Sequence, residues 1–314
     1  SARTVGDTHI RTFGGLFYDF QASGEFVLAE DGFDFIVQAR KESGAPTWPN
    51  ASVNKAVATK MGDTEVAVCL NPDRRLVVDD EVVALADGNY HYTSDGVTIW
   101  RNGNKYTILA QNGDSLSATV NNTWINANVG LGHSPSDVAG LLANVNGNVN
   151  QIASRDGTIL TAPFPFEELY QGFGNSWRVP ANQSLLAACD DPGVEAVIES
   201  GNPTEPFYAD DLPADLYEEG NQVCTNAGIT NEILLDACIL DYAFFNHESA
   251  ADVYVDMTAP TALGIVSPEG APSDEKKCWF LVWLLLITIL VLLIALIHCC
   301  LRKKKAMQYN TGQQ

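Results

Sequence analysis

Alternating apolar and polar positions run through most of the first 130 residues and predict β-strands. Two of the clearest examples are the segments 33–41 and 64–70, where every second residue is apolar. Their apolar positions are Phe33, Phe35, Val37 and Ala39 in the first segment, and Val66, Val68 and Leu70 in the second. Because successive side chains of a strand point to opposite faces, each segment places these apolar residues on one face.

A β-hairpin is the strongest local prediction. The segments 97–101 and 105–110 both read as strands, and Asn102-Gly103 lies between them. This dipeptide favours the positive backbone angles of a two-residue hairpin turn. Further strands are expected at 115–120 and 123–129, after the turn signals Asn112-Gly113 and Asn121-Asn122. Short strands separated by regular turns predict an antiparallel sandwich or barrel.

The pattern changes to helical spacing after the predicted strands. A short helix is expected over 136–143, where a Ser precedes an acidic first turn. Within 183–256, one set of residues has the spacing of an amphipathic helix. This set comprises Ile233, Leu234, Ala237, Cys238, Leu240 and Asp241. Residues 257–277 carry Pro260, Pro268 and Pro272, and they predict a short stalk.

Residues 279–297 are apolar except for Thr288 and predict a membrane-spanning helix. A helix of 19 residues is about 28 Å long, close to the thickness of a bilayer core. Trp279 and Trp283 lie at one end, and the basic run 302–305 lies at the other. The basic run predicts a cytoplasmic C-terminus, and therefore type I orientation in the plasma membrane or another surface membrane derived from the secretory pathway.

The predicted chain has five parts. They are a β-sandwich domain (1–180), an acidic, cysteine-bearing helical annex (181–256), the stalk (257–277), a single transmembrane helix (278–298) and a basic cytoplasmic tail (299–314). A signal for a lipid anchor is the competing interpretation of the apolar run, but such a signal normally ends the chain. Cys299 and Cys300 would lie at the inner leaflet, as palmitoylation sites or as free thiols. The chain starts at Ser1, and we expect a longer precursor.

The formal net charge is −21 and is unevenly distributed. Residues 179–275 hold 19 of the 39 acidic residues and no Lys or Arg. This excess of acid argues against nucleic-acid binding, which depends on Lys and Arg contacts to phosphates. Two interpretations of the acidic annex are open. It suits a basic or calcium-bridged partner, or it keeps the protein soluble in a crowded coat.

Cysteines and sequons are consistent with an extracellular domain. Cys189, Cys224 and Cys238 lie close together in the sequence, and Cys224 with Cys238 is the simplest disulfide. Cys69 has no obvious partner. No C-x-x-C motif is present, so the usual zinc-ribbon and thioredoxin motifs are missing. Sequons that predict N-glycosylation begin at Asn50, Asn121 and Asn182.

Three segments together resemble the von Willebrand factor type D domain family. They are GDTHIRTFGGLFYDFQASGEFVLAE (6–30), VAGLLANVNGN (138–148) and FGNSWRV (173–179). The second is similar to the family's Gly-Leu-Cys-Gly-Asn-Phe-Asn-Gly segment, and the third to its closing Phe-Gly-Asn-Ser-Trp motif. The motifs follow the family's order and cover about residues 5–179. The resemblance implies a β-sandwich that serves in extracellular protein assembly, as in mucins and matrix glycoproteins. Residues 183–256 resemble, more loosely, the cysteine-bearing region that often follows such a domain.

Departures from the family pattern change two expectations about the sandwich. Ala139 and Leu142 occupy positions where the family has cysteines, so apolar packing should replace those disulfides. The family's cleavage-prone Gly-Asp-Pro-His is Gly6-Asp7-Thr8-His9 here, and without the Asp-Pro bond we do not expect self-cleavage.

The family's calcium loop has also lost charge. Asn150 and Gln151 stand where many members have acidic residues, and Gly14 stands where they have Asp. The remaining oxygen donors are compatible with a weak calcium site or with a plain Asn/Gly turn, and we favour the turn. These donors are Asn144, Asn146, Asn148, Asn150 and Asp156.

The sequence therefore predicts a non-enzymatic, single-pass membrane glycoprotein. We identify no catalytic residues and no required cofactor, with Ca²⁺ as the one candidate. The extracellular domain would bind structural or adhesion proteins, or upstream parts of the same precursor, and would anchor a matrix, filament or surface coat to the membrane. The alternative is a cell-surface adhesion receptor that binds a ligand and recruits partners through its short basic tail.

Overall fold

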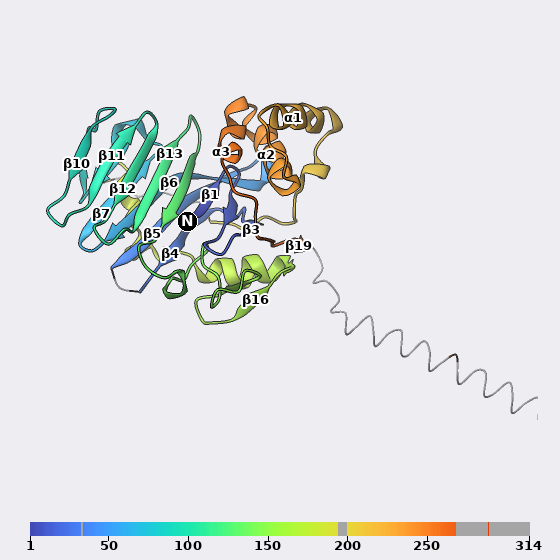
Figure 1. The fold of residues 1–314 in the computed structure, drawn as a ribbon, viewed down its shortest axis with the longest axis horizontal. Coiled ribbons are helices and arrows are strands. Elements are labelled where there is room, and N and C mark those ends of the chain that lie inside the picture. Colours follow the sequence, from blue (N-terminus) through green and yellow to red (C-terminus); the bar gives the residue numbers. More distant parts are fainter. Residues whose placement is uncertain (33, 194–199, 268–287, 289–314) are drawn as a thin grey trace, which may run out of the picture. The chain divides into compact units, whose positions relative to one another are not determined.

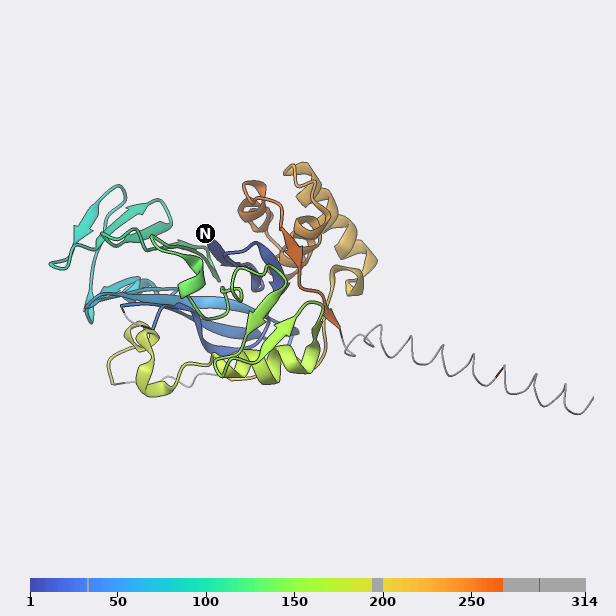
Figure 2. The same ribbon diagram turned by 60° about the horizontal axis from the view of Figure 1, so that its bottom comes forward.

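The computed structural model describes residues 1–32, 34–193, 200–267 and 288. Residues 1–268 form one compact unit in which two β-sheets face each other and a group of helices packs at one end (Figures 1 and 2). The fold is mainly β, as predicted. The large sheet has the strand order β10-β11-β12-β13-β14-β1-β2-β3-β18. All neighbours in it are antiparallel except β18, which is parallel to β3.

The strands of this nine-stranded sheet are short. They are β1 (Ala2–Val5), β2 (His9–Arg11), β3 (Leu16–Asp19), β10 (Tyr90–Tyr92), β11 (Thr98–Asn102), β12 (Lys105–Leu109), β13 (Ser115–Val120), β14 (Ile125–Gly130) and β18 (Ala262–Leu263). The predicted hairpin is confirmed, because Asn102 pairs with Lys105 and Gly103 has a φ of +60°. The strands expected at 115–120 and 123–129 are confirmed as β13 and β14.

The second sheet has six antiparallel strands in sequence order. They are β4 (Gly24–Glu30), β5 (Phe35–Gly44), β6 (Trp48–Met61), β7 (Thr64–Cys69), β8 (Leu76–Val78) and β9 (Glu81–Val82). Two small two-stranded sheets complete the β structure. They consist of β15 (Gln151–Ala153) with β16 (Ile159–Thr161), and of β17 (Phe164–Pro165) with β19 (Val266–Ser267).

The main core lies between the two large sheets. The alternation predicted for 33–41 is confirmed for Phe35, Val37 and Ala39, all of which are buried there, whereas Phe33 lies outside the described residues. Leu142, at a position where the family has a cysteine, is also fully buried in this core. Apolar packing thus occupies the place of that cysteine, whereas Ala139, at the other such position, is exposed, so the expectation is wrong there.

The outer face of the six-stranded sheet is covered as well. Ala67 and Cys69 of β7 point away from the main core and pack against Leu186 of the short helix η5 (Leu185–Cys189). A disulfide joins Cys69 to Cys189. The expectation that Cys69 has no obvious partner is therefore wrong. The 120-residue separation hid a pair that the fold brings to a Cα distance of 5.6 Å.

The helical annex packs at the β1–β3 end of the nine-stranded sheet (Figure 1). Its helices are η6 (Ala209–Asp211), α1 (Ala214–Asn226), α2 (Glu232–Phe245), η7 (Glu248–Ala251) and α3 (Asp252–Val255). The predicted amphipathic helix is confirmed as α2, and the predicted disulfide Cys224–Cys238 joins α1 to α2. Val5 and Phe17 of the sheet share a buried cluster with Leu240 of α2, so the annex and the sandwich share a common core.

The remaining short helices lie in loops. They are η1 (Pro72–Arg74), η2 (Pro135–Asp137), η3 (Glu168–Gly174) and η4 (Ala181–Gln183). The helix expected over 136–143 is wrong, because only the single turn η2 forms there. Leu141 and Leu142 instead donate backbone hydrogen bonds to the carbonyls of Val27 and Leu28 in β4. A helix would withdraw these donors from the strand.

The predicted membrane helix 278–298 lies outside the described residues except for Thr288, which is helical and exposed. Within the described ranges, no helix has both the length and the apolar character needed to cross a membrane. The first half of the predicted stalk differs from the prediction, because β18 and β19 lie in it and pair with β3 and β17. Residues 268–277 of the predicted stalk, and the whole predicted tail with Cys299 and Cys300, fall outside the described residues.

Candidate functional site

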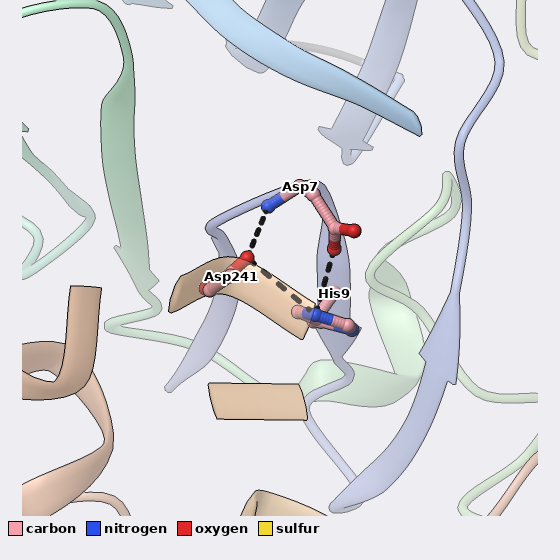
Figure 3. Close-up of side chains that lie close together, drawn as sticks. All are labelled: Asp7, His9 and Asp241. Carbon is pink, nitrogen blue, oxygen red and sulfur yellow. Dashed lines mark hydrogen bonds and ion pairs between the residues drawn. The ribbon is translucent and has the colours of Figure 1, made fainter. Parts of the chain in front are cut away.

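A tight turn between β1 and β2 presents two polar side chains to the annex. Gly6 and Thr8 both have positive φ, +60° and +71°, so the chain reverses within three residues. Asp7 and His9 flank Thr8 and point toward helix α2 (Figure 3). A Cβ at Gly6 would lie 1.8 Å from Oδ2 of Asp241, so only glycine allows α2 to approach this closely.

Asp241 joins the annex helix to this turn. Its Oδ1 accepts a hydrogen bond of 2.6 Å from the backbone N–H of Asp7, and its Oδ2 accepts one of 2.5 Å from the hydroxyl of Tyr254. The Asp241 side chain is 1% exposed. A buried carboxylate is stable only if its oxygens are paired, and both oxygens of Asp241 are.

His9 lies between the carboxylates. Its Nδ1 is 2.5 Å from Oδ1 of Asp19, and its Nε2 is 2.7 Å from Oδ1 of Asp7 and 3.6 Å from Oδ1 of Asp241. The imidazole stacks on Phe17 at a centroid distance of 5.7 Å. These contacts fix the ring plane and direct Nε2 at Asp7 and Asp241, as Figure 3 shows.

The contact between His9 Nε2 and Asp7 Oδ1 is an ion pair without hydrogen-bond geometry. Both atoms are buried, and neither has a hydrogen-bond partner among the described residues. The other oxygen of Asp7 is held, because its Oδ2 accepts a 3.3 Å hydrogen bond from Nε2 of Gln21. Asp7 and His9 are thus each fixed through one side-chain atom and Asp241 through both oxygens, and one atom of each faces a common centre.

Burial and neighbouring charges shift the pKa values of titratable groups in and near this cluster. Burial lowers the pKa of His9, but Asp7 and Asp19 outweigh it and raise that pKa well above its ordinary value. Burial raises the pKa of Asp241, with Asp7 adding to the effect and His9 opposing it. Nearby, burial lowers the pKa of Lys41 to about 7. The carboxylates of Asp7 and Asp19 therefore stabilise a positive charge at His9.

A cavity of about 260 Å³ between the sheet and the annex reaches His9. His9, Phe17, Ala237 and Leu240 line its inner part. Among the described residues that line it, the other charged ones are Asp19, Asp210 and Asp236, so every charged group besides His9 is acidic. The cavity thus favours cations over anions at the approach to His9.

A second feature lies at the far side of the sandwich from the annex. In the part of the chain that the structure describes, β10 is the last strand of the nine-stranded sheet at that side (Figure 1). Its residues Tyr90 and Tyr92 are 57% and 69% exposed. Their rings stack at 6.1 Å, and Tyr90 stacks on Trp100 of β11 at 6.2 Å. We call Tyr90, Tyr92 and Trp100 the aromatic edge.

Three oxygen donors of the predicted calcium loop accept backbone hydrogen bonds, two of them within the loop region itself. Asn144 Oδ1 accepts from the backbone N–H of Gly14, and Asn148 Oδ1 accepts from that of Asn150. Asp156 Oδ1 accepts from the N–H of Thr158. Asn146 has a φ of +47°, as an Asn/Gly turn requires. These contacts are those of a hydrogen-bonded turn, and calcium binding by this loop stays a prediction.

The three predicted glycosylation sites differ in exposure. Asn182 is exposed in the short helix η4. Asn50 is partly buried in β6, and its Oδ1 is buried. The Nδ2 atom of Asn121, which would carry a glycan, is buried as well. Asn182 is therefore the site that best fits modification of the folded chain.

The cluster of Asp7, His9 and Asp241 was not expected from the sequence. In the sequence, Asp7 and His9 stand out only as part of the altered Gly-Asp-x-His motif, and Asp241 only as one position of an amphipathic helix. A signal was available in α2, where Asp241 is the one charged residue among the positions assigned to the apolar face. A charge on the buried face of a helix needs a partner elsewhere in the fold.

The fold defines a β-sandwich domain with a helical annex whose two main helices are joined by a disulfide. Residues 2–158 match the von Willebrand factor type D domain, a match that covers half of the chain. The chain belongs to this family. Membership indicates an extracellular or secreted protein.

A curated relative extends the similarity beyond the family match. Sushi domain-containing protein 2 of Homo sapiens is 26% identical over 197 residues. The similar region covers 59% of this chain and 24% of that protein. The chain thus spans about a quarter of the length of this relative.

Proposed function

We propose that this chain is a non-enzymatic, single-pass membrane glycoprotein whose von Willebrand factor type D domain assembles with other extracellular proteins. It anchors a matrix, filament or surface coat to the membrane. The sandwich and annex supply the binding surfaces, and the residues after the annex hold them at the membrane. Family membership supports the extracellular assembly role.

The aromatic edge is the observation that carries the assembly role. A free edge strand offers unpaired backbone groups to another chain, and native proteins usually shield such an edge. Here β10 instead exposes Tyr90 and Tyr92 on it. Tyr and Trp are enriched at protein interfaces because they bury a large area at low entropic cost. The occupant we propose is an extracellular protein segment that adds to the sheet along β10.

The apolar run at 279–297 supports the anchor. Its 19 residues match the thickness of a bilayer core, and the basic run at 302–305 favours a cytoplasmic C-terminus. The two disulfides fit the oxidising environment that this topology gives the domain.

Site-specific photocrosslinking of the full chain on intact cells tests the assembly role. A crosslinking amino acid placed at Tyr92 should give a discrete adduct with an extracellular protein, and the change Tyr90→Ser should weaken it. The matched control carries the crosslinker at Val255, which is 52% exposed on α3 of the annex. Adducts that are absent at Tyr92, or identical at both positions, would contradict this surface as the interface.

A further inference from the structure

We propose that Asp7, His9 and Asp241 form a binding site for one Zn²⁺ ion, which links the sandwich domain to the annex. The ligands would be Oδ1 of Asp7, Nε2 of His9 and Oδ1 of Asp241. Two come from the β1–β2 turn and the third from α2, so a bound ion would join segments that are 232 to 234 residues apart. This inference is independent of the assembly role.

The ligand atoms already converge. In the described residues, these three side chains are the only group of three or more His, Cys, Asp and Glu residues whose ligand atoms lie within 4.8 Å of one another. Tetrahedral zinc at about 2.0–2.1 Å from its ligands keeps them about 3.3–3.4 Å apart. Nε2 of His9 is 2.7 Å from the Asp7 oxygen and 3.6 Å from the Asp241 oxygen, so the separations bracket that value.

Two of these atoms lie 2.7 Å apart as an ion pair that lacks hydrogen-bond geometry. Asp7 Oδ1 and His9 Nε2 are buried without a hydrogen-bond partner in the described structure. Buried polar atoms are rarely left so, because each costs about 1–3 kcal/mol in lost solvation. A cation at their common centre would satisfy both at once.

The surrounding contacts are those of a supported metal site. Metal-bound histidines usually donate their second ring N–H to a carboxylate, which fixes the tautomer that leaves the other nitrogen free. Asp19 occupies this position at 2.5 Å from Nδ1 of His9. Gln21 donates a hydrogen bond to the second oxygen of Asp7, and Tyr254 donates one to the second oxygen of Asp241.

The choice of zinc follows from the donor set and from access. One imidazole nitrogen and two carboxylate oxygens suit Zn²⁺, whereas Ca²⁺ needs six to eight oxygens. The acidic cavity leads to His9, and a water molecule would complete the four ligands of the ion. On binding, zinc takes the place of the proton on Nε2, which leaves to solvent, while the Nδ1 proton stays directed at Asp19.

Calorimetric titration of the metal-free full chain with Zn²⁺ tests the site. The wild type should bind one Zn²⁺ per chain, and Asp241→Asn should weaken binding at least tenfold while it retains an acceptor for the N–H of Asp7. The matched control is His133→Gln, since His133 makes a 3.4 Å contact with Asp114 outside the cluster. This control should bind as the wild type does.

A second measurement uses the wild-type protein, so its result does not depend on whether the variants fold. X-ray absorption at the zinc edge of the loaded wild type should show one imidazole with oxygen donors. Absence of stoichiometric zinc binding, equal affinity in Asp241→Asn, a sulfur-containing shell, or binding of Ca²⁺ in preference to Zn²⁺ would each overturn the proposal.

Discussion

The carboxylate of Asp241 accepts a 2.6 Å hydrogen bond from the backbone N–H of Asp7, although 234 residues separate the two. This contact joins the annex to the first turn of the sandwich. Asp241 is 1% exposed and both of its oxygens accept hydrogen bonds, so its removal has consequences beyond the loss of one side chain. The annex and sandwich should therefore unfold together, as one cooperative unit.

Replacing Asp241 should destabilise the protein. Asp241→Ala leaves the Asp7 N–H and the Tyr254 hydroxyl without their acceptor, and we expect a loss of about 2–5 kcal/mol in the free energy of unfolding. Urea denaturation of the full chain measures this change. Asp236→Ala is the matched control, because Asp236 lies on the same helix but is exposed. Equal effects of the two substitutions would contradict the interface role of Asp241.

Gly6→Ala tests the closeness of the helix to the turn. A Cβ at Gly6 would overlap the Asp241 carboxylate, whose Oδ2 would lie at 1.8 Å. Gly103 has the same φ of +60°, but no atom lies within 4 Å of the place that an added methyl group would take, so Gly103→Ala reports the backbone strain alone. That strain is about 1–2 kcal/mol. Thermal unfolding should show a clearly larger loss for Gly6→Ala, and equal losses would argue against close contact.

The buried Lys41 should make stability depend on pH. Burial lowers its pKa from 10.5 in the unfolded chain to about 7 in the folded protein. Between these values the unfolded chain binds a proton that the folded protein does not, so stability falls as pH falls, by about 1.4 kcal/mol per unit. Below pH 7 both states are protonated and the loss is complete.

Lys41→Met should therefore stabilise the protein at pH 7 and remove this part of the pH dependence. Urea denaturation at pH 7, 8 and 9 provides the measurement. Lys60→Met, at a position where the side chain is 40% exposed, should leave the dependence unchanged. A wild-type stability that is flat across this range would contradict a neutral buried amine.

The two disulfides should differ in their contribution to stability. Cys69–Cys189 closes a loop of 120 residues, and Cys224–Cys238 closes one of 14. The chain-entropy relation predicts losses of about 5 and about 3 kcal/mol when each is removed. Denaturation of the two double alanine variants compares them. A larger loss for the Cys224/Cys238 variant would mean that native packing, not loop length, sets the difference.

Local features of the fold were predictable from the sequence, and long-range contacts were not. Alternation and Asn102-Gly103 predicted the hairpin of β11 and β12, because both signals lie within the segment itself. The disulfide Cys224–Cys238 was predictable for the same reason. Cys69–Cys189 was missed because its partners meet only when η5 packs on the six-stranded sheet.

The candidate site illustrates this limit most clearly. Asp7 and His9 are neighbours in a motif, but their third partner comes from a helix near the other end of the domain. Spacing cannot reveal such a group, because it depends on how α2 docks on the sheet. The short helix expected at 136–143 was wrong for a related reason. Its backbone donors pair with β4, a strand more than 100 residues away.

The central claim is that the domain is held at the outer surface of a membrane. It is tested most directly by epitope tags placed before Ser1 and after Gln314 in the same chain, with antibody binding measured on intact and permeabilised cells. We predict that the first tag is accessible on intact cells and the second only after permeabilisation, and that deletion of 279–297 releases the domain into the medium. Equal accessibility of both tags on intact cells, or retention of the deleted form on cells, would contradict the claim.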